Sequence, residues 1–189
     1  MTWQAGGVTP ASTRPLLLGE WASLGILAEA PAHGYTVSLR LAPDGDIGRI
    51  WSVSRSLTYR AIAHLLDRSL VRELREEQGI AGGMRTLITP TARGRRALNT
   101  WLSEPVDHLR DVRTELLLKL QLCRNLGIDH EPLLDAQRAS FAPLARSLRA
   151  ADARRDMDLD PVAVWRHEYS MATMRFLDRL AATVSVARS

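Results

Sequence analysis

The 189-residue chain contains a single cysteine, Cys123, so an intramolecular disulfide is excluded. The absence of disulfides is typical of proteins that work in a reducing compartment. Cys123 ends the strongly apolar stretch LLLKLQLC, where a buried, unreactive thiol is expected rather than a nucleophile. The chain also lacks any run near the ~18 consecutive apolar residues that a membrane span needs. The sequence therefore predicts a soluble, cytoplasmic protein without a membrane partner.

The motifs that carry enzyme chemistry are missing as well. There are five histidines: His33, His64, His108, His130 and His167. They form no H-x-x-x-H or H-E-x-x-H pair, and no cluster of cysteines accompanies them. The sequence contains neither a glycine-rich phosphate loop nor a G-x-S-x-G elbow. We therefore expect no catalytic site, no metal site and no cofactor.

Acidic residues are absent from a long window, residues 78–103. The window contains four arginines: Arg85, Arg93, Arg95 and Arg96. The net charge of the whole chain is +4, so this window matches the entire excess of positive charge. Such a patch is what an anionic partner such as nucleic acid would meet, although a solvated basic face without a partner is the alternative.

The segment SRSLTYRAIAHLLDRSLV, residues 54–71, has no carboxylate before Asp67. A surface helix usually places Asp or Glu in its first turn, because the free N–H groups there carry partial positive charge. Ser54 is an expected N-cap for a helix running to about Ser69. At a helix start without acids, the free N–H groups can bind a phosphate or a neighbouring carboxylate, or remain in contact with solvent.

The spacing of side chains in this helix predicts two distinct faces. At ~100° per residue, one face collects four residues: Thr58, Ala61, Ile62 and Leu65. The opposite face carries five: Ser56, Tyr59, Arg60, Ala63 and Asp67. Near the start of the helix, that second face is polar and not bulky, which favours insertion into a groove.

The order of predicted elements around this helix points to a mainly α fold with a small β-hairpin. The expected helices are 15–30, 33–41, 54–69 and 92–102, and the expected strands are 70–77 and 84–90. This order is typical of a winged helix-turn-helix, in which the third helix enters the major groove and the hairpin wing reaches the backbone or minor groove. We divide the chain into a disordered tail (1–14), a winged domain (15–104) and a helical dimerisation domain (105–189).

The helical C-terminal half contains a regular apolar stripe. Residues of the last helix recur at i, i+4, i+7, i+11 and i+15: Trp165, Tyr169, Ala172, Phe176 and Leu180. We expect this stripe to pack, together with Leu116 and Leu120 of the preceding apolar helix, against a second copy of the chain. Packing inside its own chain is the alternative. Dimerisation is favoured because a two-fold protein matches two DNA half-sites ~34–36 Å apart.

Several stretches resemble transcriptional regulators of the PadR family. The similar segments are GILAEAPAHGYTVSLRL, YRAIAHLLDRSLV, TARGRRALNTWL, RDVRTELLLKLQL and WRHEYSMATMRFLDRL. Together they extend from about residue 16 to 180. The chain departs from the family pattern at Thr58, where an apolar residue is usual, and at Ser69, which replaces a glycine. It also departs in the wing segment GGMRTLIT, where Arg85 is the only basic residue and many relatives carry several.

The resemblance implies a homodimeric repressor that binds a pseudo-palindromic operator in double-stranded DNA and responds to a small aromatic or drug-like effector. Trp21, Trp101 and Trp165 are candidates for lining an effector pocket, with a core role as the alternative for each. The predicted DNA contacts are Ser54, Arg55, Ser56, Tyr59, Arg60, His64, Arg85 and Arg93. A winged-helix interaction module that does not bind DNA remains the competing interpretation.

Overall fold

The computed structural model describes residues 14–78, 84–153 and 160–187, and it divides into two compact units, Met1–Leu98 and Asn99–Ser189. The expected tail, apart from residue 14, lies outside the described residues, and so does the expected hairpin turn. The two units meet within a helix, whereas the sequence placed the domain boundary after Glu104.

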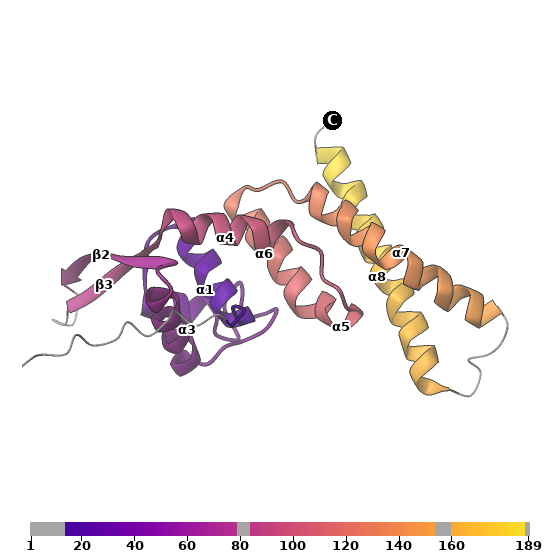
Figure 1. The fold of residues 1–189 in the computed structure, drawn as a ribbon, viewed down its shortest axis with the longest axis horizontal. Coiled ribbons are helices and arrows are strands. Elements are labelled where there is room, and N and C mark those ends of the chain that lie inside the picture. Colours follow the sequence, from indigo (N-terminus) through magenta and orange to yellow (C-terminus); the bar gives the residue numbers. More distant parts are fainter. Residues whose placement is uncertain (1–13, 79–83, 154–159, 188–189) are drawn as a thin grey trace, which may run out of the picture. The chain divides into compact units, whose positions relative to one another are not determined.

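Within its described residues, the first unit contains three helices, a three-stranded sheet and the start of a fourth helix (Figure 1). Its elements are α1 (Leu18–Glu29), β1 (Ala32–His33), α2 (Gly34–Arg40), α3 (Arg55–Asp67), β2 (Val71–Gln78), β3 (Met84–Pro90) and α4 (Ala92–Ser103). This is the element order of a winged helix-turn-helix, as the sequence predicted.

The start of α1 differs from the prediction. Pro15 does not open the helix, which begins three residues later at Leu18. The carboxylate of Glu20 accepts a hydrogen bond of 2.7 Å from the backbone N–H of Leu17, and this satisfies a donor that the helix itself leaves free. A carboxylate in the first turn therefore fixes the helix start.

The sheet has the strand order β1-β3-β2, and both pairings are antiparallel. β2 and β3 form the expected hairpin, with Val71 opposite Pro90 at one end and Gln78 opposite Met84 at the other. Sequence analysis missed β1, in which Ala32 pairs with Ile88, because two residues are too few to show an alternating pattern. β1 ties the start of α2 to the wing.

Contacts of Thr91 and Gly94 with the backbone before β2 hold the start of α4 in place. Thr91 caps the helix, since its hydroxyl accepts a hydrogen bond of 3.0 Å from the N–H of Gly94. The same hydroxyl donates to the carbonyl of Ser69 at 2.9 Å. A Cβ at Gly94 would collide with the carbonyl oxygen of Leu70, so glycine is required there.

The second unit contains helices and connecting loops, and no strand, in the part that the structure describes. Its helices are α5 (Leu109–Asp111), a π-helical turn (Val112–Leu116), α6 (Leu117–Leu126), α7 (Glu131–Ala153) and α8 (Pro161–Ala187). The π turn leads directly into α6. Gly127, which has a φ of 65°, caps the end of α6, and α8 begins at Pro161.

The core of the second unit joins the pair α7–α8 to the segments that precede it (Figure 1). The buried cluster consists of Val106, Val112, Leu116, Leu133, Leu134, Phe141 and Leu177. Polar side chains are buried beside it. Gln137, which is fully buried, accepts from the N–H of Val106 at 2.7 Å and donates to the carbonyl of Val106 at 3.0 Å.

One charged residue is also inside this unit. Lys119 is 1% exposed, and its ammonium donates to the carbonyl of Glu104 at 2.7 Å and lies 2.9 Å from a carboxylate oxygen of Glu115. The ammonium also lies 4.8 Å from the centre of the Trp101 ring. These contacts balance the charge that burial would otherwise make costly.

None of the helices that the structure describes is both long and apolar enough to cross a membrane.

Candidate nucleic-acid interface

The predicted groove-binding helix forms as α3 and divides into the two expected faces. Ser54 is the N-cap, and its hydroxyl accepts from the N–H of Leu57 at 3.4 Å. The inner face is buried and consists of Thr58, Ala61, Ile62 and Leu65. Thr58, which stands where an apolar residue was expected, is satisfied because its hydroxyl donates to the carbonyl of Ser54 at 3.1 Å.

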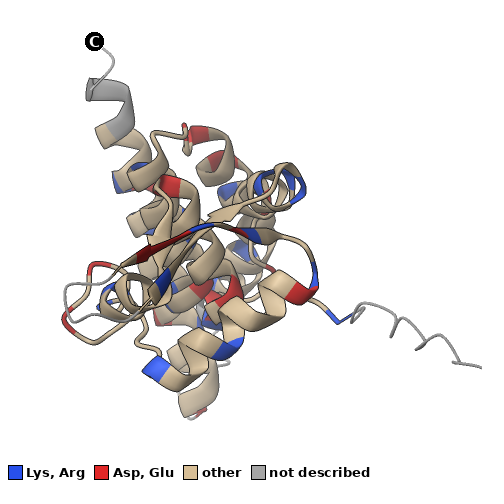
Figure 2. Cartoon of the chain, turned by 90° about the vertical axis from the view of Figure 1, so that its left-hand side faces the viewer, with Lys and Arg blue, Asp and Glu red and all other residues tan. Residues whose placement is uncertain are grey.

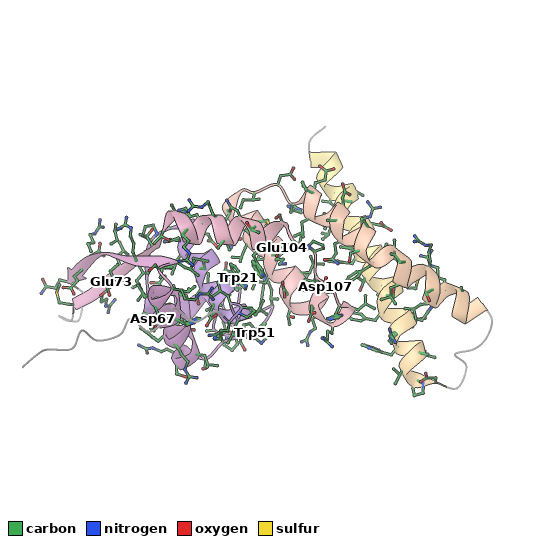
Figure 3. All side chains as sticks on the ribbon, viewed as in Figure 1. Trp21, Trp51, Asp67, Glu73, Glu104 and Asp107 are labelled. Atoms are coloured by element: carbon green, nitrogen blue, oxygen red, sulfur yellow. The ribbon has the colours of Figure 1, made fainter. Side chains whose placement is uncertain are left out.

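The outer face of α3 carries cations and hydroxyls at its start. Arg55, Ser56, Tyr59 and Arg60 are all exposed. The first acidic side chain is Asp67, at the other end of the helix (Figure 3). Because no carboxylate lies in the first turn, the partial positive charge of the free N–H groups remains available to an anion.

Leu57 is an exposed residue on this helix that sequence reasoning missed. Its side chain is 48% exposed in the first turn of α3. The helical spacing could have placed it at the edge of the outer face. An apolar side chain there can contact the methyl group of thymine in the major groove.

The guanidinium of Arg55 is held between two aromatic rings. It lies 5.1 Å from the ring centre of Tyr35 on α2 and 5.7 Å from that of Tyr59. Gly34 leaves room for the second ring, because a Cβ there would be 2.9 Å from the Cε1 atom of Tyr59. Tyr35, which no sequence pattern singled out, therefore belongs to the same cluster as the predicted residues.

His64 does not lie as predicted. Its Nδ1 is 2.9 Å from a carboxylate oxygen of Glu20 on α1, and only 17% of its side chain is exposed. Arg14 also contacts this pair, at 3.3 Å from the same ring nitrogen. The Glu20 side chain is only 4% exposed and needs polar partners, and its contact with His64 turns the imidazole toward α1 and away from a DNA-facing role.

The wing carries charges of both signs (Figure 2). Arg85 is exposed on β3, as expected. On the neighbouring strand, Arg75 pairs with Glu77 at 2.6 Å, and this hydrogen-bonded contact lowers the pKa of the Glu77 carboxyl. Glu77 also lies 3.2 Å from His33, whose other ring nitrogen is 3.1 Å from the carbonyl of Thr86. His33 thus packs against the wing.

The remaining basic residues of the acid-free window lie on α4. Arg93, Arg95 and Arg96 are all exposed. Arg95 differs from the other two because its guanidinium donates to the carbonyl of Ala28 at 3.2 Å. One of the three arginines is therefore partly engaged in holding α1 and α4 together.

In the second unit, the stripe predicted for dimerisation is only partly covered. Trp165 is 66% exposed and Ala172 is exposed, while Tyr169 is half-buried and stacks on Trp165 with ring centres 5.6 Å apart. Phe176 and Leu180 are half-buried against the core of their own unit.

The two leucines predicted to join this stripe behave differently. Leu120 is half-buried, but Leu116 is fully buried in the core of its own unit. The prediction for Leu116 is corrected, because a side chain without exposed surface has none to offer a partner.

The three tryptophans considered for an effector pocket also separate. Trp101 is buried, and its indole N–H donates to Glu115 at 3.1 Å, so it has a structural role. Trp21 is half-buried in the first unit (Figure 3). Trp165 and Tyr169 line a cavity of about 300 Å³, together with residues that include His108.

No family model matches this chain, and no curated protein matches it. Three solved structures of PadR from Bacillus subtilis are similar to it. The one in complex with operator DNA is 18% identical, covers 88% of this chain and 99% of its own, and has a TM-score of 0.47. The structure of PadR alone is 17% identical over 92% of this chain and 98% of its own, with a TM-score of 0.41. The complex with p-coumaric acid is 17% identical over 92% of this chain and 99% of its own, with a TM-score of 0.40.

Proposed function

We propose that the protein is a DNA-binding transcriptional regulator of the PadR type. One observation carries the proposal: the start of α3 exposes Arg55, Ser56, Tyr59 and Arg60 over its first two turns, with no carboxylate before Asp67. In a winged helix-turn-helix this helix enters the major groove, and its N-terminal residues meet the base edges. An acid-free start avoids repulsion from the phosphates on either side.

Five of the predicted DNA contacts have specific roles in this proposal. Arg60 reaches a guanine, whose O6 and N7 accept both arms of a guanidinium. Ser54 and Ser56 donate to phosphates near the helix start. Arg85 on the wing and Arg93 on α4 supply attraction to the backbone that does not depend on sequence.

We propose that the regulator acts as a homodimer on a pseudo-palindromic operator. The exposed part of the stripe on α8, centred on Trp165 and Ala172, is the candidate contact. An aromatic side chain that is two-thirds exposed beside a second ring is costly to leave in water and is typical of an interface anchor. Two-fold pairing would match two half-sites ~34–36 Å apart.

Repression and a response to a small aromatic molecule complete the proposal. The Bacillus PadR has been solved with p-coumaric acid, and by analogy we propose an effector of that kind here. The cavity beside Trp165 and Tyr169 is the candidate site, because two stacked rings offer a flat apolar wall. The resemblance to PadR regulators supports repression, and we propose that the protein acts in the cytoplasm, where the DNA lies.

A second candidate is a winged-helix module that binds another protein instead of DNA. The acidic residues of the wing support this second candidate, since β2 contains Glu73, Glu76 and Glu77 beside Arg72 and Arg75. Glutamates on the strand that approaches the backbone oppose DNA binding. The absence of carboxylates from α3 before Asp67 favours DNA binding, because a protein partner has no general need for an acid-free surface.

Selection of bound fragments from a genomic library, followed by footprinting, separates the two candidates. The DNA-binding proposal predicts enrichment of a pseudo-palindrome and two protected segments about one helical turn apart. A library that stays unenriched at low salt, where electrostatic attraction is strongest, would contradict DNA binding.

A further inference from the structure

A groove of about 400 Å³ lies in the first unit between α2, the start of α3 and strand β3. Two cations, Arg55 and Arg85, and two aromatic rings, Tyr35 and Tyr59, line it. Ile62 and Ile88 supply apolar surface. No carboxylate is among the described residues that line the groove.

Arg55 is arranged before any ligand binds. Its guanidinium lies over the rings of Tyr35 and Tyr59, at 5.1 and 5.7 Å from their centres. No carboxylate pairs with it in the described part of the chain. A long side chain held by aromatic rings loses less conformational freedom on binding, and its planar fork stays available for an anion.

The groove includes Arg55 and Tyr59 from the start of α3, but not Arg60, the residue proposed to read a base. Arg60 follows Tyr59 and therefore points ~100° further round the helix. If Arg60 points into the major groove, Tyr59 and Arg55 lie at its edge, where the backbone runs. The ligand that fits the groove is then anionic and elongated.

We infer that this groove seats the sugar–phosphate backbone of one DNA strand, with Arg55 binding a phosphate and Tyr35 positioning Arg55. Arg85 on the opposite wall is the second cation. A guanidinium suits this role because it donates to two phosphate oxygens at once. The inference rests on the proposed DNA-binding function.

A salt titration with a mixed-sequence duplex tests the phosphate contact. Arg55→Gln is expected to reduce the slope of log affinity against log salt by about 1, because one fewer counterion is released. The control is Arg146→Gln, which removes the same charge from an exposed position on α7 and is expected to keep the wild-type slope.

Variants of Tyr35 test the positioning role. Tyr35→Phe keeps the ring and is expected to bind like the wild type, whereas Tyr35→Leu is expected to bind about two- to five-fold more weakly. In the Arg55→Gln background, Tyr35→Leu is expected to have no further effect. A structural role for Tyr35 would instead give the same loss in both backgrounds, and circular dichroism melting of each variant checks that the fold is kept.

The outcomes separate the inference from the function on which it rests. If the wild type binds no duplex at low salt, the DNA-binding proposal fails. If the wild type binds and Arg55→Gln retains the wild-type slope, only the phosphate seat is overturned. Equal losses for Tyr35→Phe and Tyr35→Leu would show that the hydroxyl, and not the ring, is what matters, and would overturn the positioning role.

Discussion

Gln137 offers the sharpest test of how the second unit is held together. The side chain is fully buried on α7, and its amide makes two hydrogen bonds, at 2.7 and 3.0 Å, to the N–H and the carbonyl of Val106. Val106 is itself 3% exposed, so water does not replace these partners. Gln137→Leu keeps a similar volume and removes both bonds.

The expected cost follows from the two backbone groups left without partners. Each buried, unsatisfied group costs about 1–3 kcal/mol, so Gln137→Leu should lower the free energy of unfolding by about 2–6 kcal/mol. That is a large share of the ~5–15 kcal/mol by which domains are stable. Gln137→Glu should cost less at acidic pH than at neutral pH, because only the protonated carboxyl can both donate and accept.

Urea titration followed by circular dichroism and by tryptophan fluorescence measures these changes. The control is Gln121→Leu on α6, a half-buried glutamine that bonds to Asn125 at 2.8 Å, where about 1 kcal/mol or less is expected. The reasoning is refuted if Gln137→Leu costs no more than this control. It is also refuted if Gln137→Glu shows no gain in relative stability on acidification.

Three further predictions concern surfaces and reactivity. Arg85→Gln and Arg93→Gln should each reduce the salt slope of DNA affinity by about 1, and unchanged slopes would make the patch a solvated face. Trp165→Asp should weaken dimerisation in sedimentation at least about tenfold, whereas Val164→Asp, exposed ~100° away on the same helix, should not; equal effects would place the contact elsewhere. Burial raises the pKa of the Cys123 thiol to about 11, so the thiolate forms only in strong alkali. Iodoacetamide should therefore leave the native thiol unmodified at neutral pH and alkylate it in urea, and rapid native alkylation would contradict this burial.

The elements with strong periodicity were predictable from the sequence. The inner face of α3 was foreseen correctly because Thr58, Ala61, Ile62 and Leu65 repeat at helical spacing. Thr91 and Ser54 were identifiable as caps because short hydroxyl side chains satisfy free N–H groups at helix starts. These features depend on residues close together in the chain.

The features that were missed depend on contacts between distant residues. His64 was predicted as a DNA contact, but its partner Glu20 is 44 residues earlier in the sequence. The π turn at Val112–Leu116 leaves the apolar pattern nearly unchanged, so the spacing of apolar residues does not reveal it. Tyr35 became a candidate only when the fold brought it to Arg55.

The most direct test of the central claim, that α3 reads DNA, is a titration of the selected operator duplex with Arg60→Ala. The duplex is varied one base pair at a time and measured against the wild type at fixed salt. We expect a loss of about 1–3 kcal/mol in binding free energy and a relaxed preference at a single base position. Binding by Arg60→Ala with wild-type affinity and wild-type preference at every position would contradict the claim.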